Sequence, residues 1–367
     1  MTQASIDNIK RVVVRGTTWV GDSVMTVPAL RALRRLMPAA KITLAIRPSA
    51  QGLFAEADFV DDLLIYDRHG LSSVVRQTRE WRRRGFDLAV LFQNAFEAAL
   101  IPFAARIPFR LGYATEARQL LLTDAVALPE WRATRHEVFY YLYLIAALEY
   151  TLLGTNSVCD NEPDAALHLS EAGKADAFAL LRRHGVRENK TVVAICPGSI
   201  NSRAKRWPAE RYASLADRLI EKIDAEVLLI GSQEESDVSD AVISQMKQKP
   251  VLLTGKTSLA QVTAVLGLAD LVVTNDTGPA HIAAALGSPT LVIFGPTNPL
   301  TTRPFSPVAE IIRHPPDCAP CMLRDCPIDH RCMTAISVEE VFDQALVLIN
   351  RRKIATNARK LCDFVAY

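Results

Sequence analysis

The chain has 367 residues, of which 49% are hydrophobic and 22% are charged, and 42 Lys and Arg residues stand against 40 Asp and Glu. This composition excludes a disordered, collagen-like or low-complexity chain, and the small net charge argues against a nucleic-acid-binding protein. No stretch reaches the roughly 20 apolar residues that cross a bilayer, and the polar N-terminal segment has no apolar signal core. We therefore expect a two-domain cytoplasmic protein with no transmembrane segment and no nucleic-acid partner.

The first half of the chain alternates short apolar runs with segments of helical period. The runs are nearly continuous, which is typical of parallel strands buried on both faces. Helices are expected at Ala29–Met37 and at His136–Tyr150. The expected strands are Arg11–Arg15, Lys41–Arg47, Asp62–Tyr66 and Phe86–Phe92, with weaker candidates at Phe109–Tyr113 and Ala125–Leu128.

The same alternation resumes after a polar stretch, Thr151–Asp164. Ser170 is the expected N-cap of a helix that ends near His184. Further helices are expected at Ala209–Ile223 and from Val338 to about Lys353. The expected strands of this half are Thr191–Cys196, Glu226–Ile230, Val251–Thr254, Leu271–Thr274 and Thr290–Phe294.

Alternating strands and helices over the whole length predict a doubly wound α/β fold with two Rossmann-like domains. We place an N-terminal domain at residues 1–165 and a C-terminal domain at residues 166–345. Residues 346–367 form a C-terminal helix and tail, with a crossing back to the first domain as one option. Ligands of such sheets bind beyond the carboxyl ends of the strands, so we expect the chemistry in a cleft between the two domains.

The first expected strand leads through the loop Arg15–Asp22 into a helix. The loop has neither a dinucleotide pattern nor the Lys-Ser/Thr of a Walker A loop, but Gly16 and Gly21 let the backbone approach a ligand closely. Asp22 has two interpretations, as the N-cap of the helix or as a general base. The two roles compete, since a carboxylate stabilised by helix N–H groups is a weaker base. Pro28 predicts that the helix starts late or kinks there.

A second loop, which contains Gly198 and Ser199, follows a strand of the second half. The cations Arg203, Lys205 and Arg206 come shortly after it. Backbone donors of a Gly-Ser turn together with such cations suit a phosphate group. The alternative is that these cations are only solvated side chains near a helix start.

A third loop runs from a strand through Asp276, Thr277 and Gly278 into a helix of small residues. Free N–H groups at a helix N-terminus can hold a pyrophosphate, and Asp276 either accepts a hydrogen bond from a hydroxyl or caps the helix. Pro279 suits the first turn. His281 lies within one turn of this anion site and is either a ligand-binding residue or a structural histidine.

Four of the seven cysteines are concentrated near the C-terminus, at Cys318, Cys321, Cys326 and Cys332. Four thiolates could hold a structural Zn²⁺ ion, although the spacing differs from that of common zinc modules. Disulfides are disfavoured in a reducing compartment. Free or redox-labile thiols are therefore the alternative to a metal site.

Two further patterns are discounted. Thr254–Thr257 resembles the end of a Walker A loop, but Pro250 occupies the first glycine position, so we expect a strand end and a helix cap at Thr257 or Ser258. Arg82–Arg84 is read as a solvated helix face, with contact to a membrane surface as the lesser alternative.

Together these segments resemble the lipopolysaccharide heptosyltransferases of glycosyltransferase family 9. The resemblance covers residues 10–345, and the motifs occur in the expected order. The Cys-rich segment and the loop RGTTWVGD most closely resemble the heptosyltransferase II group of this family. The segments that carry the resemblance are RVVVRGTTWVGDSVMTVPALRALRRLMP, PGSINSRAKRWPAERYASLADRL, TNDTGPAHIAAALGSPTLVIFGPTNP and CAPCMLRDCPIDHRCM.

The resemblance implies a GT-B fold, in which the acceptor binds one Rossmann-like domain and the nucleotide sugar binds the other, facing domain. It implies ADP-L-glycero-D-manno-heptose as the donor and no required metal cofactor. The implied acceptor is the first heptose of the inner-core Kdo-lipid A precursor, at the cytoplasmic face of the inner membrane. Peripheral membrane contact follows from such an acceptor.

The resemblance also assigns roles to residues. The family's general base falls on Asp22 and its phosphate-binding lysine on Lys205, beside the turn Gly198–Ser199. An acidic residue that contacts the donor ribose falls on Gln233, Glu234 or Glu235, and Glu234 is our candidate. The donor motif Asp-Thr-Gly-x-x-His falls on Asp276, Thr277, Gly278 and His281.

The implied reaction is an inverting, metal-independent displacement at the anomeric carbon. Two alternatives stay open, namely a related family-9 transferase with another nucleotide sugar or core acceptor, and a non-catalytic nucleotide-sugar-binding protein. The charge is slightly uneven, since residues 1–150 carry a net charge of +4 and the remaining residues −2. This asymmetry fits an anionic acceptor on the first domain, or it is ordinary scatter.

Overall fold

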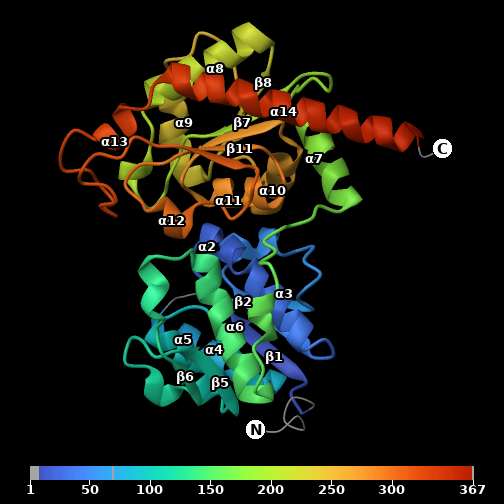
Figure 1. Ribbon diagram of the computed structural model, residues 1–367, viewed down its shortest axis with the longest axis vertical. Coiled ribbons are helices and arrows are strands. Elements are labelled where there is room, and N and C mark those ends of the chain that lie inside the picture. Colours follow the sequence, from blue (N-terminus) through green and yellow to red (C-terminus); the bar gives the residue numbers. More distant parts are fainter. Residues whose placement is uncertain (1–7, 68–69, 366–367) are drawn as a thin grey trace. The chain divides into compact units, whose positions relative to one another are not determined.

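The computed structural model describes residues 8–67 and 70–365, with residues 355–365 as helix backbone. Residues 1–7 and 366–367, which fall in the expected N-terminal segment and C-terminal tail, lie outside the described residues. The chain divides into two compact units, Met1–Ala166 and Leu167–Tyr367. Figure 1 shows a sheet flanked by helices in each unit.

The first unit contains a six-stranded sheet in the order β3-β2-β1-β4-β5-β6. All neighbouring strands pair in parallel, and this order is that of a Rossmann fold. The strands are β1 (Arg11–Arg15), β2 (Lys41–Ile46), β3 (Asp62–Ile65), β4 (Leu88–Leu91), β5 (Phe109–Tyr113) and β6 (Asp124–Val126).

Helices flank this sheet, and two of them replace the single helix expected after β1. Thr26 separates them, and Pro28 lies in the first turn of the second one, where its missing N–H leaves no bond unmade. The helices are α2 (Val20–Met25), α3 (Val27–Leu36), α4 (Gly70–Arg84), α5 (Phe96–Ala104) and α6 (Glu137–Leu153).

The second unit repeats the architecture with a parallel sheet in the order β12-β11-β10-β7-β8-β9. Counted from β7, this is the same strand order as in the first unit. The strands are β7 (Val192–Cys196), β8 (Glu226–Leu229), β9 (Val251–Leu252), β10 (Leu271–Asn275), β11 (Thr290–Ile293) and β12 (Ala309–Ile312). The predicted doubly wound α/β class is confirmed in both units.

Two α-helices of the second unit begin at serine N-caps. Ser170 accepts a hydrogen bond from the N–H of Gly173 at 3.0 Å, and Ser258 accepts one from Gln261 at 3.3 Å, as expected of N-caps. The helices are α7 (Glu171–Arg183), α8 (Ala209–Ile223), α9 (Ser236–Ile243), α10 (Leu259–Leu268), α11 (Gly278–Ala285), α12 (Pro299–Thr302), α13 (Arg331–Thr334) and α14 (Val338–Val365).

The core of each unit lies on its central strands. Val12, Val13 and Val14 of β1 are fully buried, as are Val272 and Val273 of β10. Burial of one such side chain contributes about 1.5–3 kcal/mol, which explains why the continuous apolar runs form central strands.

The last helix, α14, packs against α8, β10 and β11 within the second unit (Figure 1, red). It is continuous from Val338 to Val365, so residue 346, where we placed a boundary, lies inside it. No helix in the described ranges is both long and apolar enough to cross a membrane.

The sequence pattern did not indicate β12, a strand at the edge of the second sheet where Glu310 interrupts the apolar run. The arginines expected on a solvated helix face make ion pairs as well. Arg83 and Arg84 both bind Glu80, and Arg84 also binds Asp62. The arginine-rich end of α4 is thus engaged in local pairs.

Candidate active site

In each unit, the strand order reverses between two central strands, β1 and β4 in the first and β7 and β10 in the second. Ligands of doubly wound sheets bind outside the carboxyl ends of the strands at this switch point. Three of the loops singled out in the sequence follow β1, β7 and β10. Each unit therefore presents its candidate residues where the fold favours ligand binding.

The loop after β1 is closely braced. A Cβ atom on Gly16 would lie 2.9 Å from Cγ2 of Ile46 and 3.2 Å from the carbonyl oxygen of Ala45, so only glycine fits. The hydroxyls of Thr17 and Ser23 lie 3.0 Å apart, and Ser23 donates to the carbonyl of Trp19 at 3.0 Å. These contacts fix the path of the chain into α2.

Asp22 lies in the first turn of α2 and is half-buried. The N-cap of this helix is Trp19, so the interpretation of Asp22 as the N-cap is wrong. Burial and the nearby carboxylate of Asp22 raise the pKa of Tyr141, a residue of α6. Asp22 thus lies near Tyr141, while its role as a base stays a prediction.

A buried arginine ties this loop to the one after β4, which the sequence did not indicate. Arg15 is 1% exposed and donates to the side-chain oxygens of Gln93 at 3.2 Å and Gln77 at 2.5 Å. Its guanidinium stacks 3.5 Å from the ring centre of Tyr66. Gln93 in turn donates to Thr18 at 3.1 Å, so the β1 and β4 loops are joined at the switch point.

Arg118 holds the other side of the β4 loop. It is fully buried and donates to the carbonyls of Tyr113 and Gln93 and to the side chain of Asn94, at 2.9, 2.5 and 3.0 Å. Burial lowers the pKa of Arg118 to about 10, which leaves it charged at neutral pH. Two buried arginines, Arg15 and Arg118, therefore hold the loop after β4 at the switch point of the first unit.

In the second unit, the turn after β7 contains Gly198 and Ser199. A side chain at Gly198 would overlap the carboxylate of Glu235, which is itself held by the N–H of Ser232 at 2.9 Å. The carbonyl of Ser199 accepts two hydrogen bonds from Arg206, at 3.2 and 3.0 Å. The half-buried Arg206 therefore braces the turn.

Asn275, the last residue of β10, joins the β7 and β10 loops. Its amide nitrogen donates to the carbonyls of Pro197 and Gly198 at 2.8 and 3.2 Å. Its amide oxygen accepts from the N–H of Trp207 at 3.0 Å and the hydroxyl of Tyr212 at 2.9 Å. Asn275 is fully buried, and such a satisfied polar network fixes a single geometry.

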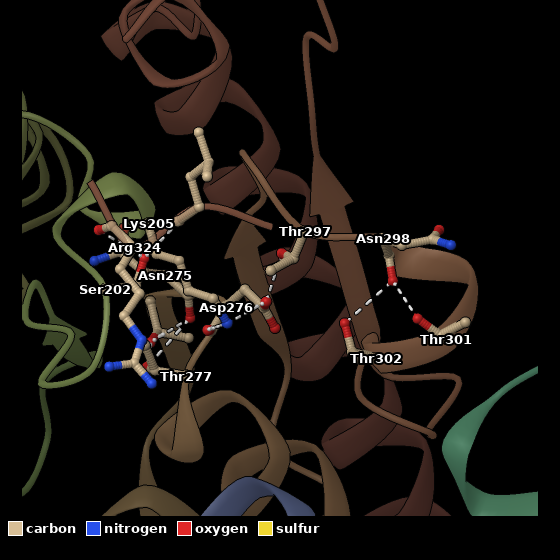
Figure 2. Close-up of polar contacts among 12 residues, drawn as sticks. Ser202, Lys205, Asn275, Asp276, Thr277, Thr297, Asn298, Thr301, Thr302 and Arg324 are labelled. Atoms are coloured by element: carbon tan, nitrogen blue, oxygen red, sulfur yellow. Dashed lines mark hydrogen bonds and ion pairs between the residues drawn. The ribbon is translucent and has the colours of Figure 1, made fainter. Parts of the chain in front are cut away.

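Lys205 and Asp276 form an ion pair beside these loops (Figure 2). The Lys205 ammonium donates to Oδ2 of Asp276 at 2.8 Å and to the Asp276 main-chain carbonyl at 3.0 Å. The same Oδ2 atom accepts a hydrogen bond from the hydroxyl of Thr297 at 2.7 Å. Asp276 is 3% exposed and the Lys205 side chain 25%. The cation therefore faces solvent more than its partner does.

The helix α11 starts next to this ion pair. Thr277 is its N-cap, Gly278 is its first residue, and His281 is buried in the following turn. The N-terminal N–H groups of a helix carry partial positive charge and bind anions. Lys205 adds a full positive charge, so the second unit holds an arrangement that suits a diphosphate.

The acidic candidates after β8 occupy different environments. Glu235 points back toward Gly198, whereas Glu234 is exposed. Hydrogen bonds from its own backbone and from Ser232 lower the pKa of Glu234. Contact of Glu234 with a donor ribose stays a prediction.

The cysteine cluster has a graded exposure. Cys318 is exposed, Cys321 and Cys326 are half-buried, and Cys332 is buried. Burial and the three other cysteines raise the pKa of Cys332 to about 11. Within the described part of the chain, no three His, Cys, Asp or Glu side chains are placed to hold one metal ion. The Zn²⁺ site stays a prediction.

The chain was compared with known protein families and proteins, and both comparisons give matches. Residues 74–331 match the model of glycosyltransferase family 9 (heptosyltransferase). Lipopolysaccharide heptosyltransferase 2 of Salmonella typhimurium is 30% identical over 312 residues, which cover 83% of this chain and 88% of that protein. Lipooligosaccharide heptosyltransferase 2 of Haemophilus ducreyi is 31% identical over 68% of this chain and 73% of that protein.

The solved structure of E. coli ADP-heptose lipopolysaccharide heptosyltransferase II is similar with a TM-score of 0.80 at 26% sequence identity. The similarity covers 94% of this chain and 99% of that one, and it confirms the predicted GT-B fold class. The chain belongs to glycosyltransferase family 9, the family of the heptosyltransferases.

Proposed function

We propose that this glycosyltransferase moves L-glycero-D-manno-heptose from ADP-heptose to the first heptose of the Kdo-lipid A inner core, in lipopolysaccharide biosynthesis. The observation that carries the proposal is the Lys205 ammonium, which lies beside the N-terminus of α11 at the switch point of the second sheet. The similarity to enzymes named heptosyltransferase 2 supports heptose transfer to lipopolysaccharide, and the similarity to E. coli ADP-heptose lipopolysaccharide heptosyltransferase II supports ADP-heptose as the donor.

The donor end of the reaction needs stabilisation of a leaving diphosphate. Lys205, together with the N–H groups of Thr277 and Gly278, would bind its oxygens. Donors that are fixed before the reaction are most effective where charge develops in the transition state. Gly198 and Ser199 would line the same site, with Asp276 and His281 positioning the donor and Glu234 contacting its ribose.

The acceptor end needs removal of a proton from the attacking hydroxyl, and we assign this task to Asp22. As the acceptor oxygen bonds to the anomeric carbon, the bond from that carbon to the ADP oxygen breaks, and the configuration inverts. The proton goes to the Asp22 carboxylate, and the negative charge leaves on ADP. General-base catalysis of this kind contributes typically 10²–10⁴-fold.

The positive groups named above would take the place of a divalent cation, so the proposed reaction requires no metal cofactor. A Zn²⁺ ion on the four cysteines has no part in it and would be structural.

We also propose peripheral contact with the cytoplasmic face of the inner membrane, because the acceptor is lipid-anchored. The net charge of +4 on residues 1–150 supports this contact, since anionic surfaces attract basic segments.

The experiment combines the purified chain with ADP-heptose, other ADP-sugars or UDP-sugars and truncated Kdo-lipid A acceptors, presented in detergent or in anionic vesicles. We expect ADP-heptose to be turned over fastest and the product to gain the mass of one heptose on the inner heptose. A preference for another sugar nucleotide or a later core acceptor would favour the related transferase. Binding of ADP without transfer to any acceptor would favour the non-catalytic protein.

A further inference from the structure

Thr297 lies in the loop after β11 and contacts the Lys205–Asp276 ion pair of the second unit. Thr297 is 5% exposed, and its hydroxyl donates to the same carboxylate oxygen of Asp276 that accepts from Lys205. Figure 2 shows these two hydrogen bonds meeting at Asp276. The resemblance to the family assigned no role to this residue.

The loop that carries Thr297 is fixed on its other sides. The N–H of Phe294 donates to the carbonyl of Ile312 at 2.9 Å, and the carbonyl of Pro296 accepts from the N–H of Met322 at 2.9 Å. A Cβ atom on Gly295 would overlap the side chain of Met333. The Thr297 hydroxyl therefore reaches Asp276 from a rigid support, as a positioning group requires.

The hydrogen bonds of the Lys205 ammonium indicate how the Thr297 hydroxyl affects ligand binding. An ammonium has three N–H donors, and Asp276 accepts two of those on Lys205. The third is the one that an oxygen of a bound diphosphate would take. Without the Thr297 hydroxyl, Oδ2 of Asp276 would lose one of its two hydrogen-bond donors and would interact more strongly with the Lys205 ammonium. The Asp276 carboxylate could then also rotate. The ammonium would then be held more tightly by Asp276 and less well aimed at a ligand.

We propose that Thr297 is a positioning residue that sets the direction of the Lys205 ammonium through the carboxylate of Asp276. This inference rests on the proposed function, because it concerns the binding of the nucleotide diphosphate at that site. Thr297 itself need not touch the ligand.

The test compares Thr297→Val with Thr297→Ser by titration calorimetry with ADP and by steady-state kinetics with ADP-heptose. We expect Thr297→Val to weaken ADP binding about tenfold, which corresponds to about 1.4 kcal/mol. Thr297→Ser, which keeps the hydroxyl, should bind ADP like the wild type. The acceptor KM should not change in either variant.

Thr301→Val is the matched control. Thr301 is 9% exposed, lies in the short helix α12 four residues after Thr297 and donates to the carbonyl of Asn298, away from Asp276 (Figure 2). We expect this variant to bind ADP normally, although it loses a buried hydroxyl in the same way. Thermal unfolding of all variants tests for folding, and Thr297→Ala replaces Thr297→Val if the latter does not fold.

A double-mutant cycle shows whether the effect passes through Lys205. In a Lys205→Ala background, the Thr297→Val change should have no further effect on ADP affinity. Equal effects in both backgrounds would overturn the proposal, as would unchanged ADP affinity in Thr297→Val or a loss in Thr297→Ser. A wild-type protein that does not bind ADP would instead overturn the proposed function, and this inference with it.

Discussion

Three cations follow the turn after β7, and each has a different partner. Arg203 is exposed and pairs with Asp325 at 2.6 Å. Arg206 binds the carbonyl of Ser199. Lys205 binds Asp276 beside the N-terminus of α11. Of the three, Lys205 therefore has the position that suits a phosphate.

This division of roles predicts different effects on nucleotide binding. Lys205→Ala should weaken ADP binding roughly ten- to hundredfold, because hydrogen bonds to charged groups contribute about 1.5–3 kcal/mol. Arg203→Ala, the matched control from the same turn, should leave ADP binding unchanged. Titration calorimetry with ADP measures both, and thermal unfolding verifies that each variant folds. An equal loss in the two variants would show that the turn attracts ADP only through its overall charge.

The sequence predicts part of this site and misses the rest for a physical reason. Lys205 and Asp276 could be identified because they lie in motifs next to strand ends. Asn275 and Thr297 were not identified, since an Asn or Thr at a strand end has no distinctive pattern. Their hydrogen bonds connect loops distant in the chain, and only the folded sheet brings those loops together.

At the scale of elements, a buried carboxylate joins α6 to the segment that follows it. Glu149 is 1% exposed and accepts hydrogen bonds from Thr155, Ser157 and Val158 at 2.6–2.8 Å. Burial alone would raise the pKa of Glu149, but these hydrogen bonds, with that from the Ser157 hydroxyl the largest, lower it overall. The polar stretch between the two halves of the sequence is therefore anchored to α6.

This anchoring predicts a pH-dependent contribution to stability. Because the folded-state pKa of Glu149 is lowered, its carboxylate stabilises the fold above the unfolded pKa of about 4.5, and this stabilisation is lost as the pH falls through the folded-state pKa. Glu149→Gln should lower the free energy of unfolding at pH 7 by about 2 kcal/mol. The difference from wild type should shrink at pH 3.

Urea unfolding at pH 7, 5 and 3 measures this difference. Glu162→Gln is the matched control, because Glu162 is an exposed carboxylate of the same segment and should change stability little at any of these pH values. A difference between Glu149→Gln and wild type that stays constant from pH 7 to pH 3 would contradict the role of the charge.

At the scale of the whole molecule, the two units repeat one strand order with different loops. The sequence predicts this architecture well, because central strands such as β1 and β10 are continuous apolar runs. The sequence does not predict the edge strand β12, because this strand is only partly buried and Glu310 interrupts its run of apolar residues. The loops after the carboxyl ends of the strands carry the residues to which we assign the chemistry, namely Asp22 in the first unit and Lys205 in the second.

We propose that the two units divide the reaction, with the base in one and the diphosphate site in the other. The most direct test measures heptose transfer and ADP affinity in Asp22→Ala, with Asp22→Asn as the variant that keeps the side-chain shape. We predict that transfer falls by at least about 10²-fold in both variants, while ADP affinity stays at the wild-type value. Near-normal transfer in Asp22→Ala would show that Asp22 is not the base and would contradict this division of the reaction.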